Sequence, residues 1–286
     1  MTDILSQIVA KKREEITALK AGVSLERLRD EARQAAPALD FVAALRGPRP
    51  RGDQPRGQSR EANIIAEIKL RSPSRGEFPW QGDPVRQARA YEQGGAKAIS
   101  VVTDGPFFGG SAALLQAVKS ATTLPVLQKD FVLEPYQVHY ARSLGADAVL
   151  LIARLLPGTL LGELVGLSGE VGLATLVEVV DLAELGRATA AGAAVIGVNN
   201  RDLRTFRTDV AHTLELLPHF TSEQVAVTES GFHTWADVEP MLRAGADAFL
   251  IGEALMVAPD PAALLKTVRG ESRGEAAVKA AVEAAS

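Results

Sequence analysis

Five ionisable side chains stand at or near the ends of short apolar runs: Glu67, Lys69, Lys129, Glu178 and Glu229. The first two are two residues apart in ANIIAEIKLRSPSRGEF, residues 62–78, and a β-strand directs residues i and i+2 to the same face. Buried charges are costly unless they are paired or used. Positioned Lys and Glu side chains can transfer protons to a reacting group, so the pattern indicates acid–base catalysis. Buried ion pairs that only fix the fold are the structural alternative.

Composition limits the class of protein and of partner. The chain has 286 residues, of which 47% are hydrophobic and 23% charged, as in a globular protein of one large domain or two ordinary ones. A formal net charge of −4 argues against nucleic acid as the main partner. A small phosphorylated ligand remains compatible with that charge, because a few local groups suffice to bind a phosphate.

The sequence gives no indication of a metal site, a signal peptide or a membrane-spanning segment. The absence of cysteine excludes disulfides, thiolate metal sites and a cysteine nucleophile. The histidines do not have metal-ligand spacing and are interpreted as ordinary surface or interface residues: His139, His212, His219 and His233. The N-terminal stretch lacks the apolar segment of a signal peptide, and no apolar run has the length of a membrane span. We therefore expect a cytoplasmic protein with no metal, no membrane partner and no nucleic-acid partner.

A repeat indicates how these side chains are positioned. Four segments have Gly-Ala followed by a short apolar run and then polar residues, at 93–103, 143–153, 190–200 and 243–253. They recur about every 50 residues, the period of two βα units. Glycine after an amphipathic stretch is typical of a helix end, and apolar runs without alternation are typical of strands buried on both faces.

Further strands and helices fill the intervals. Additional strands are expected at 64–69, 125–131, 174–180 and 225–230. Helices are expected at 84–94, 111–121, 134–144, 158–169, 181–191, 209–218, 234–244 and 260–268, several opening with a capping signal, at Asp83-Pro84, Ser111, Asp181 and Thr234. Eight strands each followed by a helix predict an α/β fold, a closed (β/α)8 TIM barrel. An open doubly wound sheet is less favoured, because the repeat continues through all eight units.

The remaining segments lie outside this repeat. Residues 1–45 predict an N-terminal helical extension of two helices, and residues 46–61, rich in Pro, Gly and Arg, predict a flexible loop rather than a nucleic-acid tag. Residues 62–270 are expected to form the barrel, within one domain overall. Residues 271–286 are expected to be either a frayed helix or a disordered tail.

The carboxyl ends of the strands carry the chemistry in such a barrel. Charges at five of the eight ends make the purely structural alternative hard to sustain, and Asn199 and Arg201 join the same mouth. Ser230-Gly231 and Gly252-Glu253 follow the last two strands, where backbone N–H groups suit a phosphate, and the SPSRG stretch adds hydroxyls. A phosphorylated substrate is therefore expected. Asp130 and Asp202 fit a ligand role and a loop-capping role equally well.

Six segments together resemble the indole-3-glycerol-phosphate synthase family: IIAEIKLRSPSRG, LQKDFVLEPYQVHYARSLGADAVLLIA, LVEVV, IGVNNRDL, TESGF and IGEALM. The resemblance covers roughly residues 1–268. It implies a (β/α)8 barrel of tryptophan biosynthesis without metal or organic cofactor. The implied reaction converts 1-(2-carboxyphenylamino)-1-deoxyribulose 5-phosphate into indole-3-glycerol phosphate, carbon dioxide and water. The expected oligomeric state is a monomer or a weak homodimer.

The resemblance also implies roles for individual residues. Lys129 is the general acid in ring closure, Glu178 stabilises the cationic intermediate, and Lys69 binds the substrate carboxylate and acts in dehydration. The division of acid–base roles among the Lys and Glu residues stays open. The implied catalytic residues are Glu67, Lys69, Lys129, Glu178, Asn199 and Glu229. The implied substrate-binding residues are Ser72, Phe108, Phe131, Arg201, Leu203 and Ser230. The phosphate-binding residues are Lys69, Ser72, Gly231, Gly252 and Glu253.

Small departures and two rival functions complete the interpretation. Gln128 stands where the family often has Arg, Leu70-Arg71 replaces a usual Lys-Ala pair, and Thr228 replaces a common Ser. None of these removes a residue with an implied chemical role.

Phosphoribosylanthranilate isomerase is a shorter barrel that uses a cysteine base, which this chain lacks. A non-catalytic sugar-phosphate-binding barrel would not need two Lys and three Glu at its mouth.

Overall fold

The computed structural model describes residues 4–46, 61–73, 75–78, 82–201 and 207–271. Most of the predicted loop at 46–61, most of the tail at 271–286, and the candidate residues Asp202 and Leu203 lie outside the described residues. The division into extension, barrel and tail stays a prediction. Within the described ranges, no helix is long and apolar enough to cross a membrane.

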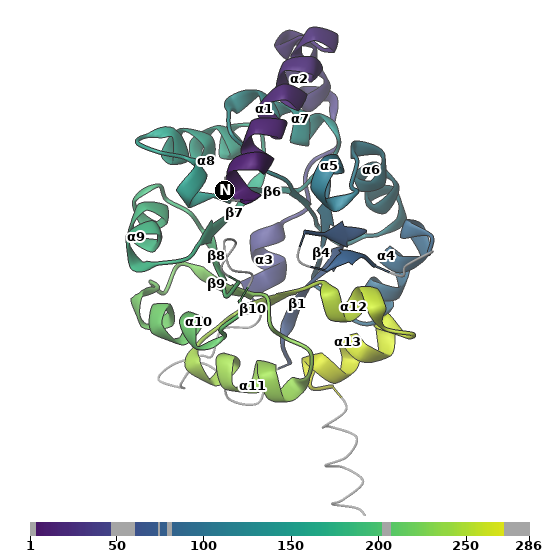
Figure 1. Cartoon of the computed structure of the whole chain (residues 1–286), viewed down its shortest axis with the longest axis vertical. Helices are drawn as coiled ribbons and strands as arrows, with labels where there is room; N and C mark the ends of the chain where they lie inside the picture. The colour runs from purple at the N-terminus through teal and green to yellow at the C-terminus, as the bar shows by residue number, and fades with distance from the viewer. Residues whose placement is uncertain (1–3, 47–60, 74, 79–81, 202–206, 272–286) are drawn as a thin grey trace, which may run out of the picture.

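Eight parallel strands close into a barrel, in the order β1-β10-β9-β8-β7-β6-β5-β4. The strands are β1 (Asn63–Ile68), β4 (Ala98–Val102), β5 (Val126–Lys129), β6 (Ala148–Ile152), β7 (Ala174–Val179), β8 (Val195–Asn199), β9 (Val225–Glu229) and β10 (Ala248–Ile251). Closure excludes the open doubly wound sheet and confirms the (β/α)8 prediction. Figure 1 shows the helices arranged around the strands.

The predicted helices are present outside the barrel: α4 (Pro84–Gln93), α6 (Ala112–Ala121), α7 (Pro135–Ser143), α8 (Leu160–Glu170), α9 (Leu182–Ala190), α10 (Ala211–Leu216), α11 (Trp235–Ala244) and α13 (Pro261–Arg269). The capping signals are real, since Asp83, Ser111 and Asp181 each accept a hydrogen bond from a first-turn backbone N–H. Thr234 begins α11 with a capping box. Helix α10 ends earlier than predicted and gives way to the 3₁₀ turn η2 (Leu217–His219).

Every second side chain along a barrel strand points into the barrel interior. Ile65, Leu127, Leu176 and Val227 are among the buried residues that form one apolar cluster inside the barrel. Residues at odd and even positions of a strand face opposite sides, so the next inward position lies two residues further along. Those next positions are Glu67, Lys129, Glu178 and Glu229. The charged residues therefore form the layer directly above the apolar interior, at the carboxyl ends of the strands.

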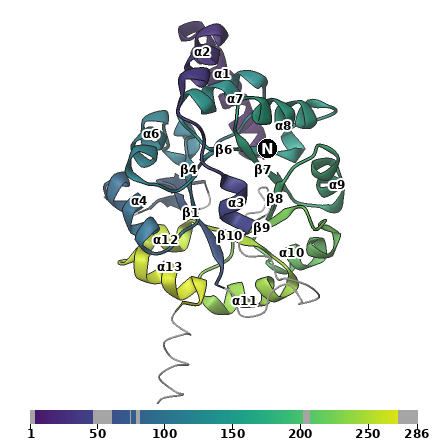
Figure 2. The same ribbon diagram turned by 180° about the vertical axis from the view of Figure 1, so that it is seen from behind.

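The N-terminal extension has three helices where two were predicted. Helices α1 (Ile4–Gly22) and α2 (Leu25–Gln34) match the prediction, and α3 (Phe41–Arg46) was missed because six residues give too little periodic pattern to recognise. Phe41 and Leu45 of α3 are fully buried and join the interior cluster. Figure 2 shows α3 in front of the centre of the ring of helices, so it closes the amino-terminal end of the barrel.

Two further features differ from the sequence-based expectation. Short elements occupy loops at the mouth: β2 (Arg71–Ser72), β3 (Gly76–Glu77), α5 (Gly105–Phe108), the 3₁₀ turn η1 (Ala153–Leu155) and α12 (Glu253–Val257). His139 on α7 is buried, with 6% of its surface exposed, so its interpretation as a surface histidine was wrong. Burial and the nearby arginines lower the pKa of His139. A single polar residue among apolar neighbours in sequence gives no signal of its tertiary burial.

Candidate active site

Lys129 lies between two carboxylates at the centre of the mouth. Its Nζ is 3.3 Å from Glu178 Oε2 and 3.2 Å from Glu229 Oε2. The lysine comes from β5, the glutamates from β7 and β9, so barrel closure alone brings them together. Burial by itself would lower the pKa of Lys129, but the charges of Glu229, Glu178 and Glu67 outweigh it and raise that pKa above its usual value. Lys129 is therefore an ammonium group, able to donate a proton.

Glu229 is a carboxyl group with a pKa raised towards neutral pH. It is 2% exposed, and burial raises its pKa from 4.5 to about 7, against the opposing effect of Lys129. The neighbouring charges of Glu178 and Glu67 contribute to the rise. Its Oε1 is buried and has no hydrogen-bond partner among the described residues. A carboxyl with a pKa near 7 and an unused oxygen is suited to accept or give a proton during a reaction.

Glu67 and Lys69 form a second ion pair at the end of β1. Lys69 Nζ is 2.8 Å from Glu67 Oε1, and the two side chains are 11% and 3% exposed respectively. Tyr91, fully buried on α4, donates a hydrogen bond of 3.0 Å to the backbone oxygen of Glu67 and so fixes the strand end. Glu67 Oε2 is buried without a partner in the described part of the chain. The pair therefore leaves an acceptor oxygen available beside the cavity.

A cavity of about 670 Å³, part of it open to solvent, connects these groups. The predicted residues that line it are Glu67, Lys69, Phe108, Lys129, Phe131, Glu178, Asn199, Arg201, Glu229 and Ser230. Phe108 and Phe131 form an apolar wall with ring centroids 6.0 Å apart, and Leu150, Ile152 and Leu250 form the floor. An apolar cavity with a few converging polar groups is the usual form of a small-molecule site.

A second, more polar cavity adjoins the first across Glu67, Lys69 and Arg201. It has a volume of about 520 Å³ and is lined also by Gly231, Gly252 and Glu253. Burial would raise the pKa of Glu253, but Arg201, at 2.6 Å, together with Lys69 and Arg75, lowers it. The carboxylate of Glu253 is thus paired with the Arg201 guanidinium, as the carboxylate of Glu67 is paired with Lys69 in the same cavity.

The turn after β9 is held in an unusual conformation. Ser230 has a φ of 67° and Gly231 a φ of 95°, and only glycine adopts the left-handed region freely. Asn200 stabilises the turn by donating from Nδ2 to the Ser230 backbone oxygen and to Thr228 Oγ1, at 3.2 and 3.0 Å. Ser230 Oγ in turn donates to Asn199 Oδ1 at 3.1 Å. The turn therefore presents Ser230 and Gly231 to the polar cavity in a fixed geometry.

One predicted residue is not among the described residues that line these cavities, and another lies outside the described part of the chain. Ser72 on β2 is buried and is not among the described residues that line either cavity. Leu203 lies outside the described residues. Arg201 holds its own loop, with its backbone N–H bonded to Asn199 Oδ1 and its Nε to Thr208 Oγ1. These contacts fix the loop, and the substrate-binding role of Arg201 stays a prediction.

Sequence reasoning missed Lys12, which contacts the aspartate next to Lys129. Lys12 Nζ is 2.8 Å from Asp130 Oδ1, and Asp130 also accepts from the Phe131 backbone N–H at 2.7 Å. Asp130 thus has the loop-fixing role that the sequence left open, although it also lines the cavity. A signal was present, because Lys12 lies between Ile8 and Ile16 on one face of α1.

Comparison with known proteins gives a consistent result. The family model described as indole-3-glycerol phosphate synthase matches residues 5–268. The chain is 45% identical over 266 residues to an indole-3-glycerol phosphate synthase of Desulfosudis oleivorans, covering 93% of this chain and 98% of that one. It is 44% identical to one of Azoarcus sp. strain BH72, covering 94% and 100%. Among solved structures, thiamine phosphate pyrophosphorylase from Pyrococcus furiosus shares the fold alone, at a TM-score of 0.55 and 16% identity, over 73% of this chain and 94% of that one.

Proposed function

The chain belongs to the indole-3-glycerol phosphate synthase family, carboxy-lyases of tryptophan biosynthesis that act on a small phosphorylated substrate, and we propose that the residues at its barrel mouth carry out the family's reaction as follows. The substrate is 1-(2-carboxyphenylamino)-1-deoxyribulose 5-phosphate. The carboxyphenyl ring lies against Phe108 and Phe131, and the phosphate lies in the polar cavity. The observation that carries the proposal is Lys129, an ammonium group 3.2–3.3 Å from two carboxylates inside a largely apolar cavity.

Ring closure is assigned to Lys129. The ring carbon that bears the carboxylate attacks the ketone carbon, a carbon–carbon bond forms, and the ketone oxygen takes a proton from the Lys129 ammonium group. The ring then carries a positive charge. The carboxylates of Glu178 and Glu229, whose side chains are 4% and 2% exposed, stabilise that charge. The carboxylates also hold Lys129 in its charged form before the reaction begins.

Decarboxylation and dehydration complete the reaction. Loss of carbon dioxide returns the bond electrons to the ring and restores its aromaticity. The hydroxyl group made in the first step then leaves as water, which requires an acid for the hydroxyl and a base for a proton of the substrate. Lys69, paired with Glu67 at 2.8 Å, is the assigned acid, and the unused oxygens of Glu67 and Glu229 are the available bases. Asn199 is assigned to a substrate hydroxyl.

Phosphate binding is assigned to the loops after β9 and β10. Lys69 and Arg201 supply positive charge, and Gly231 and Gly252 let the backbone approach the ligand. Glu253 contributes only through its backbone, because its carboxylate pairs with Arg201. Ser72 and Leu203 remain predicted contacts, as do the cytoplasmic location and the monomeric or weakly dimeric state.

A direct assay tests the proposal. Purified protein is mixed with the carboxyphenylamino-deoxyribulose phosphate, and indole fluorescence is followed with time. A rise in fluorescence, with release of one carbon dioxide per indole formed, is the expected result. Binding of the substrate without any product would mean that the chain is a sugar-phosphate-binding barrel and not an enzyme.

We expect kcat/KM to fall as the pH falls through about 7. The pKa of Glu229 is raised from 4.5 to about 7, so this group is ionised above that pH and protonated below it. Only the ionised form stabilises the cationic intermediate, so protonation slows the reaction. A profile of kcat/KM from about pH 5 to about pH 9 measures the effect.

Two variants test whether Glu229 causes this fall of kcat/KM below about pH 7, the acidic limb of the pH profile. Glu229→Gln should lack it, because an amide does not titrate. Glu178→Gln should retain it at a lower pH, because the charge of Glu178 contributes to raising the pKa of Glu229. An unchanged limb in Glu229→Gln would assign the titration to a different group.

We expect Gly197→Ala to lower kcat by about tenfold or more, because it displaces a catalytic carboxylate. A Cβ at Gly197 on β8 would lie 2.2 Å from Glu229 Oε1, so the side chain of Glu229 must move. The backbone at Gly197 does not have a positive φ, so alanine introduces no strain of its own there. Gly186→Ala in α9 is the control, because nothing lies within 4 Å of its added Cβ. Wild-type kcat in Gly197→Ala would remove Glu229 from the mechanism.

A further inference from the structure

Helix α1 carries a lysine on its buried face. The buried residues of α1 are Ile8, Lys12 and Ile16, spaced four apart along one stripe. A lysine beside apolar neighbours usually extends its ammonium group to solvent, but Lys12 is only 5% exposed. Its charge must therefore be compensated inside the molecule.

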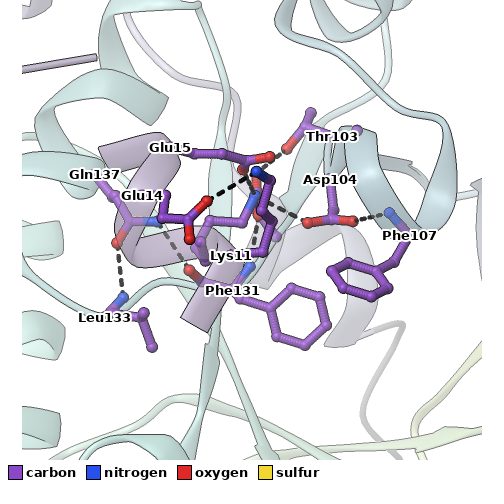
Figure 3. A network of polar contacts seen from close by, with 12 residues as sticks. Lys11, Glu14, Glu15, Thr103, Asp104, Phe107, Phe131, Leu133 and Gln137 are labelled. Carbon is purple, nitrogen blue, oxygen red and sulfur yellow. Dashed lines mark hydrogen bonds and ion pairs between the residues drawn. The ribbon is translucent and has the colours of Figure 1, made fainter. Parts of the chain in front are cut away.

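Three carboxylates surround the ammonium group of Lys12. Nζ is 2.8 Å from Asp130 Oδ1, 3.0 Å from Asp104 Oδ1 and 2.7 Å from Glu15 Oε2. Glu15 belongs to α1, whereas Asp104 follows β4 and Asp130 follows β5. Figure 3 shows a network of polar contacts in this region, in which Glu15, Asp104 and Phe131 are labelled. Lys12 thus connects the N-terminal helix to two separate loops of the barrel mouth.

Each of the two aspartates holds one half of the aromatic wall. Asp130 accepts a hydrogen bond from the Phe131 backbone N–H at 2.7 Å. Asp104 is the N-cap of α5 and accepts from the Phe107 backbone N–H at 3.0 Å, and α5 ends at Phe108. The rings of Phe108 and Phe131 lie 6.0 Å apart and line the catalytic cavity. The separation of the two rings therefore depends on the separation of the two aspartates.

A cation lies between the two aspartates, in addition to the β4–β5 pairing and the Thr103–Asp130 hydrogen bond that join the same two loops. Asp104 is 1% exposed and the side chain of Asp130 is 12% exposed, so water screens their repulsion poorly. Burial would lower the pKa of Lys12, but Asp130, Glu15 and Asp104 outweigh it and raise that pKa, so Lys12 is charged. Without Lys12 the repulsion between the two carboxylates would no longer be compensated by a cation.

We propose that Lys12 is a positioning residue for the aromatic ring of the substrate: its ammonium group holds Asp104 and Asp130 together and so sets the separation of Phe108 and Phe131. The inference rests on the proposed function, in which these two rings contact the carboxyphenyl ring. It makes the N-terminal extension part of the substrate site, although no residue of α1 lines the catalytic cavity.

The first test compares Lys12→Met with Lys11→Met. Methionine keeps the length of the side chain and removes its charge. We expect KM to rise about tenfold in Lys12→Met, with kcat changed by less than about threefold, because substrate binding is lost more than chemistry. Lys11 is the control: it is exposed on the same helix and pairs with Glu14 at the surface, so KM stays unchanged. Wild-type KM in folded Lys12→Met would overturn the inference.

A double-mutant cycle with Phe131→Ala separates positioning from general structural support. If Lys12 acts through the aromatic wall, Lys12→Met changes KM by less than about twofold once Phe131 is absent. A purely structural role would instead give the same fold-change in both backgrounds, and that result would also overturn the inference.

A milder variant covers the case in which Lys12→Met does not fold. Asp104→Asn keeps the N-cap of α5, because asparagine caps as well as aspartate, and removes one of the three negative charges around Lys12. We expect KM to rise in the same direction, and an unchanged KM would count against the proposal. Absence of turnover in the wild-type protein would overturn the proposed function itself. If the wild-type protein turns over substrate and the KM of Lys12→Met or Asp104→Asn equals that of the wild type, only this inference is overturned.

Discussion

Replacing Lys129 with methionine is expected to lower kcat by about 10³-fold or more while the protein stays folded. A general acid contributes roughly 10²–10⁴-fold, and Lys129 also supplies the positive charge that two carboxylates require. Methionine fills nearly the same volume, so the cavity keeps its shape. Glu178 and Glu229 lose their shared cation, 3.3 and 3.2 Å away, and are expected to take up a proton rather than unfold the barrel mouth.

Ligand binding distinguishes loss of chemistry from loss of the site. Lys129→Met should bind the product, indole-3-glycerol phosphate, with an affinity within about threefold of wild type, because the aromatic wall and the phosphate cavity are unchanged. Indole fluorescence follows turnover, and calorimetry follows binding. A variant that is folded, binds product and retains wild-type kcat would exclude Lys129 as the acid.

Replacing Glu178 with glutamine is expected to lower kcat by about 10²–10³-fold with little change in KM. The amide keeps the shape of the carboxylate but not its charge, and this charge acts mainly when the ring intermediate becomes cationic. Interactions made only in the transition state appear in kcat and not in KM. Steady-state kinetics at a pH well above 7 measures the effect, so that Glu229 remains ionised.

The control for Glu178→Gln is Glu163→Gln on the exposed face of α8. It makes the same chemical change at the surface, where the only hydrogen bond described for the carboxylate is from Thr159. Its kinetics should equal those of the wild type. If Glu178→Gln raised KM and left kcat unchanged, Glu178 would be a binding residue and the cationic intermediate would be stabilised by other groups.

The sequence by itself determined the class of fold and which charged residues stand at the strand ends. The change from apolar to charged residues at the end of a strand is local, so it can be recognised without coordinates. Glu67, Lys129, Glu178 and Glu229 show this pattern. Helix caps such as Ser111 and Asp181 were equally local and were predicted correctly.

Only the tertiary structure decided which charges act together. Lys129 pairs with Glu178 and Glu229, 49 and 100 residues away, whereas Lys69 pairs with Glu67 on its own strand end. The sequence-based prediction also lacked three features: helix α3 at the amino-terminal end of the barrel, the burial of His139 and the three carboxylates around Lys12. The physical reason is that local periodicity fixes the direction of a side chain, whereas its partners depend on barrel closure and on how distant segments pack, which no short stretch of sequence encodes.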